Sequence, residues 1–496
     1  MHPRQLVRDS FGTALSQFLA RLALLARGVV AAAVLGPLGY GAWNALNLLV
    51  DYGAYASGGA LQGLDLRLPA AAARDDRAAA RGLMTGAWSV VAMGGAVFVL
   101  AASAYLLAGG GRFATPWGWA APALMLAVVA LYLAIQYHAG ALRAHGEFRA
   151  VNEALAAQAV LGGGLGLALV GPFKVWGLLG AWLLASLAAL AWMRRGPTRP
   201  PLTLGRWREG LALTRLGLPV FSFYAVSLVL RSVDRLAFVR FAGTEGLGHY
   251  SLGLMAAGLI LYLPESAATV LYPRLAAAAQ GARDPVRTRA ELRQVHRALA
   301  VALPPIAAIG MIWAGPVVAW LLPAYREGIL PLRILSLGAL MLSGATLPGY
   351  CVVAQGPRGR LLAVSAGVAA LTAVLVFSVA ARDPRPAAIA VAAAIGYAAF
   401  GLELVLLAAP VLCASLGERL GFVAASFVPA GWAGGLALAA CAFGANESPL
   451  TATLRSAAVA VAYLPALWGF GRGAGLKRLV QEWLAGRVIP VVGDSS

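Results

Sequence analysis

Charged residues, acidic residues and cysteines are all scarce in this chain of 496 residues. Only 12% of the residues are charged, and Asp and Glu together number 20. A soluble protein of this length exposes far more charge, so the composition excludes an ordinary cytosolic enzyme. Cys351, Cys413 and Cys441 lie far apart in apolar stretches, and the five histidines form no pair with a Cys, Ser or carboxylate at metal-binding or catalytic spacing. The sequence therefore offers no disulfide framework, metal site or catalytic constellation, and no cofactor is expected.

Apolar residues are abundant instead. They make up 60% of the chain, and the mean hydropathy is +0.77. A helix that spans a bilayer needs about 20 apolar residues. The sequence predicts an all-α polytopic membrane protein with about 14 such helices. They are expected near residues 11–35, 41–65, 83–108, 117–142, 152–171, 174–193, 215–240, 247–273, 298–322, 329–355, 361–381, 386–412, 421–443 and 450–470.

The basic residues report the orientation of these helices. Lys and Arg number 39, for a formal charge of +19, and most of them fall in the two termini and in every second loop. This is the positive-inside pattern, so the charge indicates topology and not a nucleic-acid partner. Both termini are predicted to be cytoplasmic in a bacterial inner membrane. A cleavable signal peptide would suit the small residues Ala31–Ala33, but Arg21 and Arg27 interrupt the apolar stretch, so a retained first helix is expected.

An internal repeat divides the chain. Residues 35–73 can be laid over residues 242–279, so that Leu38-Gly39-Tyr40 meets Leu247-Gly248-His249 and Arg67 meets Arg274. The offset equals six spans, and an even number of spans predicts two parallel repeats related by an axis along the membrane normal. The predicted organisation is an N-lobe at 1–195, a cytoplasmic linker at 196–214, a C-lobe at 215–412, two added spans at 413–475 and a cytoplasmic tail at 476–496.

Four arginines lie deep inside the first and seventh predicted spans. Arg21 and Arg27 belong to the first span, and Arg231 and Arg235 to the seventh. A charge at the centre of a spanning helix costs about 3 kcal/mol on insertion scales, so each needs a partner or a wet cavity. A guanidinium group presents a planar fork of donors that matches phosphate oxygens. The four arginines are therefore candidates for binding an anionic substrate.

Two carboxylates could neutralise these arginines without any ligand. Asp51 reaches roughly the depth of Arg21 and Arg27, and an ion pair with either would satisfy both groups. Asp234 could neutralise Arg231 three residues earlier, or a basic residue on a neighbouring helix. The residues alone leave both the binding role and the structural role open.

Other charged residues also lie in predicted spans, and no role is assigned to two of them, Asp65 and Glu403. Glu265 follows Pro264, so it is either a site for protonation or ion coupling or a satisfied residue at a helix kink. Arg333 and Arg455 lie near the predicted outer surface, where they can extend to water, and no function is assigned to them.

Three stretches carry a resemblance to a known family. They are RGVVAAAVLGPLGYG at 27–41; the segment 216–250 with Gly217-Leu218-Pro219, Val233-Asp234-Arg235 and Leu247-Gly248-His249-Tyr250; and the segment 322–335 with Leu322-Pro323-Ala324-Tyr325 and Leu332-Arg333-Ile334-Leu335. Over about residues 10–410 the chain resembles the oligosaccharide flippase branch of the multidrug/oligosaccharidyl-lipid/polysaccharide exporter superfamily.

This resemblance implies a V-shaped bundle of two six-helix lobes that alternates between inward-open and outward-open states. Its implied cargo is a polyprenyl-diphosphate-linked oligosaccharide, moved from the inner to the outer leaflet. Related lipid II flippases carry two arginines spaced like Arg21 and Arg27, which face the cavity and act on the diphosphate, and two extra C-terminal helices that help to hold the lipid tail. The second span here continues as Asp51-Tyr52-Gly53 and lacks the basic pair of that branch. An O-antigen (lipopolysaccharide), capsule or exopolysaccharide unit is therefore favoured over lipid II.

Other functions are consistent with parts of this pattern. A cation-coupled drug exporter of the same fold would have an acidic cavity. A membrane-embedded polysaccharide polymerase or ligase would need a large outer loop with catalytic groups, and the outer loops here are short. A scaffold of an export complex would keep the repeat for packing alone. The expected partners are membrane lipids, a coupling cation (H+ or Na+) and a polysaccharide polymerase.

Overall fold

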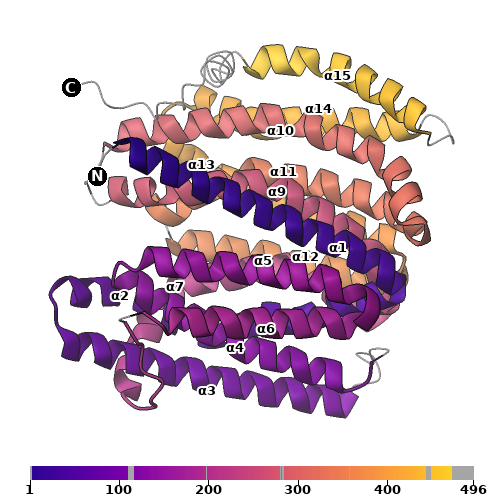
Figure 1. The fold of residues 1–496 in the computed structure, drawn as a ribbon. Coiled ribbons are helices and arrows are strands. Elements are labelled where there is room, and N and C mark those ends of the chain that lie inside the picture. Colours follow the sequence, from indigo (N-terminus) through magenta and orange to yellow (C-terminus); the bar gives the residue numbers. More distant parts are fainter. Residues whose placement is uncertain are drawn as a thin grey trace. The chain divides into compact units, whose positions relative to one another are not determined.

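The chain is helical throughout the part that the structure describes. The computed structural model describes residues 3–109, 117–196, 198–279, 281, 284–356, 358–442 and 448–471, with side chains from residue 25 onward except at 269, 270, 273, 276, 277, 279 and 358. Its α-helices (Figure 1) are α1 (Pro3–Gly53), α2 (Ala60–Ala73), α3 (Arg77–Gly109), α4 (Ala120–Ala144), α5 (Phe148–Phe173), α6 (Val175–Met193), α7 (Trp207–Leu230), α8 (Val233–Ala237), α9 (Gly243–Ala279), α10 (Pro285–Leu321), α11 (Ile329–Gln355), α12 (Arg358–Arg382), α13 (Pro386–Leu412), α14 (Leu416–Ala442) and α15 (Pro449–Gly471). Short 3-10 helices lie at Ala54–Ser57 and Pro323–Gly328, and a π-helical turn at Phe238–Ala242.

Thirteen helical segments of the described residues are long and apolar enough to cross a membrane. The polytopic all-α fold expected from the composition is thereby confirmed. The count is one below the predicted 14 because the first two predicted spans share one segment, Leu25–Ser57. Gly36 divides this segment with non-helical angles (φ 68°, ψ 175°), so α1 consists of two helices joined without a loop.

The helices form two compact units, Met1–Gly248 and His249–Ser496. In the first unit, α2, α3, α4 and α7 enclose a core of Leu64, Leu68, Ala71, Ala80, Met84, Ala87, Tyr137, Ala141 and Leu213. Helix α7 belongs to this unit because its backbone lies against α2 and α3. A Cβ atom at Gly217 would collide with the carbonyl oxygen of Gly59, and one at Gly210 with that of Gly86. Such close backbone contact through small residues is how helices associate in lipid. The lobe boundary expected from the sequence at 196–214 stays a prediction.

In the second unit, α14 and α15 pack on α10. Their shared core contains Ala308, Met311, Ile312, Ala433, Ala437, Ala452, Val459 and Tyr463. The Tyr463 hydroxyl donates a hydrogen bond to the Val301 carbonyl at 2.8 Å, which ties α15 to α10. Helices α14 and α15 are thus integral to this unit, and their addition to twelve repeat spans stays a prediction.

The internal repeat has a structural counterpart in two glycine turns. Gly36 (φ 68°, ψ 175°) and Gly243 (φ 78°, ψ 176°) adopt the same left-handed backbone, which side chains other than glycine rarely tolerate. The two turns are 207 residues apart (243 − 36), as are Arg67 and Arg274 (274 − 67). A uniform offset of 207 also places Gly41 opposite Gly248. The expected match of Gly39 with Gly248 was therefore wrong by two residues, since letter similarity alone did not locate the turns.

The helix segments that directly follow the two turns, residues 37–41 and 244–248, also contact each other. A Cβ atom at Gly41 would collide with the carbonyl oxygen of Thr244, and one at Gly248 with that of Pro37. Thr244 is the repeat counterpart of Pro37, so the contact is made twice with the partners exchanged. A reciprocal contact of this kind is expected of elements related by a twofold axis.

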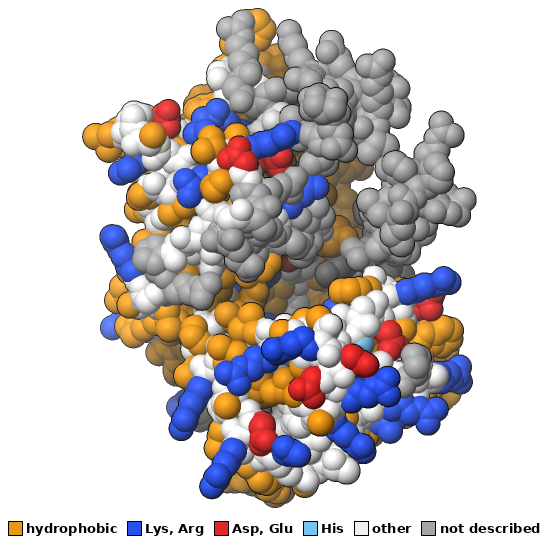
Figure 2. All heavy atoms as spheres, turned by 90° about the vertical axis from the view of Figure 1, so that its left-hand side faces the viewer, with side chains coloured by type: hydrophobic (Ala, Val, Ile, Leu, Met, Phe, Trp, Pro, Cys, Tyr) orange, Lys and Arg blue, Asp and Glu red, His pale blue; other side chains and the backbone are white. Residues whose placement is uncertain are grey.

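Arginine side chains gather at one end of the first unit, where the connections between α2 and α3, α4 and α5, and α6 and α7 lie. Figure 2 looks onto this end, and its lower half shows many basic side chains. Exposed arginines in these connections and the adjoining helix ends are Arg74, Arg77, Arg81, Arg143, Arg149, Arg195, Arg199, Arg206 and Arg208. The three basic connections of the first unit that are predicted to be cytoplasmic therefore lie at the same end of that unit and are exposed.

Candidate functional site

The seventh predicted span is broken at its arginines. Helix α7 ends at Leu230 and α8 begins at Val233, with Arg231 and Ser232 between them. The Ser232 hydroxyl donates to the Leu228 carbonyl at 2.7 Å, and the Ser232 N–H donates to the Val229 carbonyl. These local bonds satisfy backbone groups that a continuous helix would pair, so the break is stable inside an apolar segment. Discontinuous helices of this kind often mark binding sites in transporters.

The second predicted span is broken as well. A 3-10 helix at Ala54–Ser57 follows α1, and Gly58 (φ 56°) and Gly59 (φ 97°) then turn the chain into α2. Asp51, Tyr52 and Tyr55 lie beside this break. Hydrogen bonds from this segment connect the two breaks, so they form one polar site inside the first unit.

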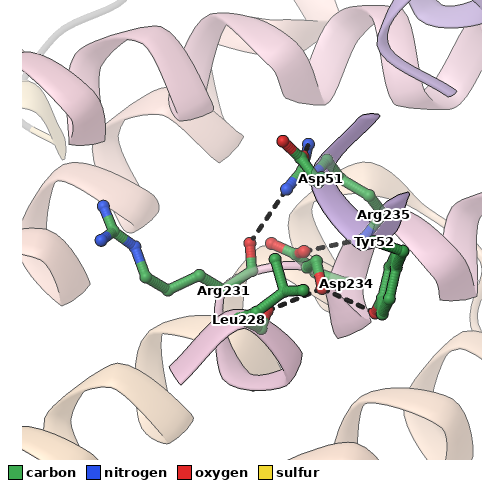
Figure 3. A network of polar contacts seen from close by, with 7 residues as sticks. Asp51, Tyr52, Leu228, Arg231, Asp234 and Arg235 are labelled. Atoms are coloured by element: carbon green, nitrogen blue, oxygen red, sulfur yellow. Dashed lines mark hydrogen bonds and ion pairs between the residues drawn. The ribbon is translucent and has the colours of Figure 1, made fainter. Parts of the chain in front are cut away.

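Asp51 and Arg235 form an ion pair in this site, with 2.8 Å between Oδ2 and Nη1 (Figure 3). The Arg235 side chain is 14% exposed and that of Asp51 37% exposed. The sequence placed Asp51 opposite Arg21 or Arg27, but its partner is Arg235 of the seventh span. Relative helix rotation decides which arginine a carboxylate reaches, and hydropathy carries no information on that rotation.

Asp234 has a structural role at the break. Its side chain is completely buried, and its Oδ1 accepts the N–H of Arg235 at 2.7 Å. A carboxylate at the first turn of a helix satisfies a free N–H and interacts favourably with the helix dipole. The guanidinium of Arg231 extends away from both Asp51 and Asp234 (Figure 3) and the residue is exposed. Neutralisation of Arg231 by Asp234 stays a prediction.

Arg27 lies in α1, away from these carboxylates. It is half-buried, and its aliphatic stem packs on α5, because a Cβ atom at Gly166 would lie 2.7 Å from the Arg27 Cδ. Among the side chains that the structure describes, no carboxylate lies within ion-pair distance of Arg27. Arg21 lies in the same helix, and its side chain is outside the described residues.

The formal charges of the residues singled out from the sequence, of which Arg27 lies apart from the broken helices, do not cancel. Arg27, Arg231 and Arg235 carry three positive charges, and Asp51 and Asp234 two negative charges. The remaining charge (3 − 2 = 1) is positive before Arg21 is counted. An arginine keeps its charge at any physiological pH, and the binding of an anion by these residues stays a prediction.

Tyrosines complete the polar site and were not anticipated from the sequence. The Tyr52 hydroxyl lies 2.7 Å from the Ser232 Oγ, and the Tyr55 hydroxyl donates to the Tyr224 carbonyl at 3.2 Å. Tyr55 also packs on Phe221 with ring centroids 5.7 Å apart. The sequence could have indicated them, because Tyr52 and Tyr55 lie within four residues of Asp51, a charged residue inside a predicted span.

The sequence analysis also discussed two charged residues that lie in the second unit, Glu265 and Arg333. Glu265 lies in α9 and is half-buried, and its coupling role stays a prediction. Arg333 does not extend to water as expected: it is 8% exposed, and its Nε donates to the Met311 carbonyl at 3.1 Å. The chain turns through the 3-10 helix at Pro323–Gly328 before α11, which places Arg333 inside the unit.

Removing one member of the Asp51–Arg235 pair should destabilise the protein. Asp51→Asn leaves the mostly buried Arg235 guanidinium without its carboxylate. Because Asp51 is partly exposed, we expect a loss of about 2 kcal/mol, below the 3–5 kcal/mol typical of fully buried pairs. Thermal unfolding in detergent measures this loss. The double variant Asp51→Asn/Arg235→Gln should lose less than the two single changes combined. Additive losses would show that the pair is not coupled.

Comparison with known proteins agrees with this fold. The profile of the family described as "Polysaccharide biosynthesis protein" matches residues 95–325. No curated protein sequence matches the chain significantly.

Several solved structures are similar over most of their length. The lipid II flippase MurJ in an inward closed conformation has a TM-score of 0.68 at 12% identity, covering 92% of this chain and 99% of MurJ. An inward-facing multidrug resistance MATE transporter of the MOP superfamily has a TM-score of 0.61 at 18% identity, covering 82% and 95%.

A MOP superfamily transporter from Pyrococcus furiosus, whose binding pocket is described as having reverse polarity, has a TM-score of 0.55 at 16% identity, covering 83% and 93%. At sequence identities of 12–18%, the similarity to these structures shows that the fold is shared and does not by itself show a shared function. The protein therefore has the fold that MurJ shares with transporters of the MOP superfamily, and residues 95–325 match a polysaccharide biosynthesis family.

Proposed function

We propose that the protein moves a polyprenyl-diphosphate-linked oligosaccharide from the inner to the outer leaflet of the bacterial cytoplasmic membrane. The observation that carries the proposal is the positive charge left at the broken helices and on α1 after Asp51 and Asp234 are counted. The match to a polysaccharide biosynthesis family and the likeness to a lipid II flippase fold support it.

Arg27 is the proposed centre of diphosphate binding, together with Arg21. Charge-assisted hydrogen bonds from guanidinium groups to phosphate oxygens are among the strongest polar contacts in proteins. Arg231 and Arg235 extend the positive region, with Asp51 holding Arg235 in place. The sugars are proposed to lie near the tyrosines of the site and the polyprenyl chain to stay in lipid, with α14 and α15 contributing to its groove. The cargo is an O-antigen, capsule or exopolysaccharide repeat unit.

The membrane potential would favour outward movement of this cargo. A diphosphate with two negative charges gains about 4–5 kcal/mol per 100 mV when the inside is negative. A coupling cation, H+ or Na+, is proposed to reset the empty carrier through Asp51 or Glu265, and a polysaccharide polymerase is the proposed recipient of the product.

A drug exporter of the same fold is the second candidate, because multidrug transporters share this fold. Such an exporter would use a free carboxylate to bind a cationic drug. In the polar site of the first unit, Asp51 is engaged by Arg235 at 2.8 Å, and Asp234 is buried against the backbone of α8. The charge balance therefore favours the anionic cargo. Polymerase, ligase and scaffold functions have no comparable support in the site.

Deleting the gene should cause a lipid-linked oligosaccharide to accumulate on the cytoplasmic leaflet. Mass spectrometry of extracted lipids identifies the sugars and the polyprenyl chain, and protection from an externally added glycosidase reports the leaflet. Complementation with the intact gene should restore export. A deletion strain with normal surface polysaccharide and no accumulated lipid-linked precursor would rule out the proposed cargo, and altered drug resistance would support the exporter.

Reporter fusions should place both termini in the cytoplasm. Alkaline phosphatase is active only outside, so a fusion at Asp383, between α12 and α13, should be active. A fusion at His145, between α4 and α5, should be inactive, and a green fluorescent protein at the C-terminus should fluoresce. Reversed activities would overturn the proposed orientation and the direction of transport.

A further inference from the structure

A carboxyl group is buried in the second unit, remote in sequence from the arginines of the site. Glu403 is the only charged residue of α13, which otherwise consists of apolar, glycine and tyrosine residues. It lies nine residues before the end of the helix (412 − 403) and is 7% exposed. Neither the proposed transport of a diphosphate nor the packing of an apolar helix requires an ionisable group here.

The two oxygens of Glu403 differ in their surroundings. Oε1 accepts a hydrogen bond from the Ser365 hydroxyl of α12 at 2.6 Å, and Ser365 is itself completely buried. Oε2 is buried and has no hydrogen-bond partner among the described residues. The carboxyl group is therefore bound on one side only.

The part of the neighbouring helix α11 that packs near Glu403 carries no charged residue, since Arg333 lies eight residues before Met341. Met341 and Ala345 of α11 pack against Gly401, two residues before Glu403, and Gly349 packs against Leu404. Within the described ranges, no Lys, Arg or His side chain lies within ion-pair distance of Glu403. Among the described side chains, Ser365 alone forms a hydrogen bond with it.

An ionised carboxylate in such surroundings would be strongly destabilising, whereas a neutral carboxylic acid with one hydrogen bond is tolerated. A bound metal ion is a poor alternative, because hard cations take several oxygen ligands and, among the described side chains, only the Ser365 hydroxyl bonds to the carboxyl group. Across the described residues, no group of three or more His, Cys, Asp and Glu side chains could hold a metal.

We propose that Glu403 and Ser365 form a proton-binding site inside the second unit. The proton resides on Oε2, and Oε1 accepts the Ser365 hydroxyl. Because α12 supplies Ser365 and α13 supplies Glu403, release of the proton requires a rearrangement that admits water or a cation between these two helices. Proton occupancy is thereby linked to the packing of α12 on α13, independently of what the arginines of the first unit bind.

Infrared spectroscopy of the protein in lipid bilayers tests this site. At neutral pH the spectrum should contain the C=O stretch of a protonated carboxylic acid. Glu403→Gln should remove this band, and Ser365→Ala should shift it, because the hydrogen bond to Oε1 is lost. Glu418→Gln is the matched control, since Glu418 is exposed in the first turn of α14 and its replacement should leave the band unchanged.

Unfolding temperatures provide a second measurement. Glutamine resembles the neutral acid in shape, so Glu403→Gln should keep the unfolding midpoint of the intact protein at neutral pH. On raising the pH, the intact protein should lose stability and the variant should lose less. A protonated band that persists in Glu403→Gln, or one abolished by adding Na+ at constant pH, would overturn the proton site. If the variant does not fold, an unshifted band in Ser365→Ala overturns it instead.

Discussion

Replacing Arg27 by alanine should reduce transport about 10- to 100-fold at a normal protein level. Arg27 is half-buried with no carboxylate within ion-pair distance among the described side chains, so its charge is available to a ligand. Hydrogen bonds to charged groups contribute about 1.5–3 kcal/mol each, and 1.4 kcal/mol corresponds to a tenfold change. The measurement is the rate at which surface polysaccharide reappears when the variant is induced in the deletion strain.

Two control variants separate charge from packing at this position. Arg27→Lys keeps the charge but loses the planar fork, and it should retain part of the activity. Arg81→Ala removes an exposed arginine at the basic end of α3 and should leave transport unchanged. Equal activity of Arg27→Ala and the intact protein would contradict the diphosphate site. Loss of transport in Arg81→Ala as well would indicate an effect of overall charge.

Gly41→Ala should separate the two helix segments that follow the glycine turns, residues 37–41 and 244–248. The added Cβ atom would overlap the Thr244 carbonyl, which is backbone and cannot rotate away. Forcing an extra carbon into a packed contact costs about 1–3 kcal/mol, and the conformation that makes the contact should become roughly 5- to 150-fold less populated. If transport alternates between conformations, this change should also slow it strongly.

Cysteine reactivity measures the separation. In a background without Cys351, Cys413 and Cys441, Thr244→Cys is half-buried and should react slowly with a maleimide. Its reaction should become several-fold faster when Gly41→Ala is added. Gly164→Ala is the matched control, because a Cβ atom there meets nothing within 4 Å. Unchanged reactivity and an unchanged unfolding temperature in Gly41→Ala would show that the turns are not in contact.

Comparison of the two halves of the sequence located the internal repeat but not its exact register. Matching letters found the two related segments but paired Gly39 with Gly248. The backbone angles of Gly36 and Gly243 then set the offset at 207 and brought Gly41 opposite Gly248. Glycine patterns in Ala-rich helices align in several registers with similar scores. Only the left-handed backbone distinguishes a turn glycine from a packing glycine.

Sequence also identified the charged residues of the site better than their partners. Arg231, Arg235 and Asp51 were singled out because charges are costly in apolar segments, and two of them form an ion pair. The same reasoning assigned Arg333 to the surface, although it is buried, and noted Glu403 without a role. Depth along a helix follows from residue number, but burial depends on the neighbouring helices.

Hydropathy and the distribution of arginines alone determined the class of protein, the approximate number of spans and the predicted orientation, since each follows from the transfer of individual side chains between water and lipid. Tertiary structure decided that Asp51 pairs with Arg235, that the seventh span breaks at Ser232 and that α7 packs on α2 and α3. These contacts depend on the rotation of each helix about its axis, which is set by close backbone approaches such as that of Gly59 and Gly217 and is not encoded in any single segment.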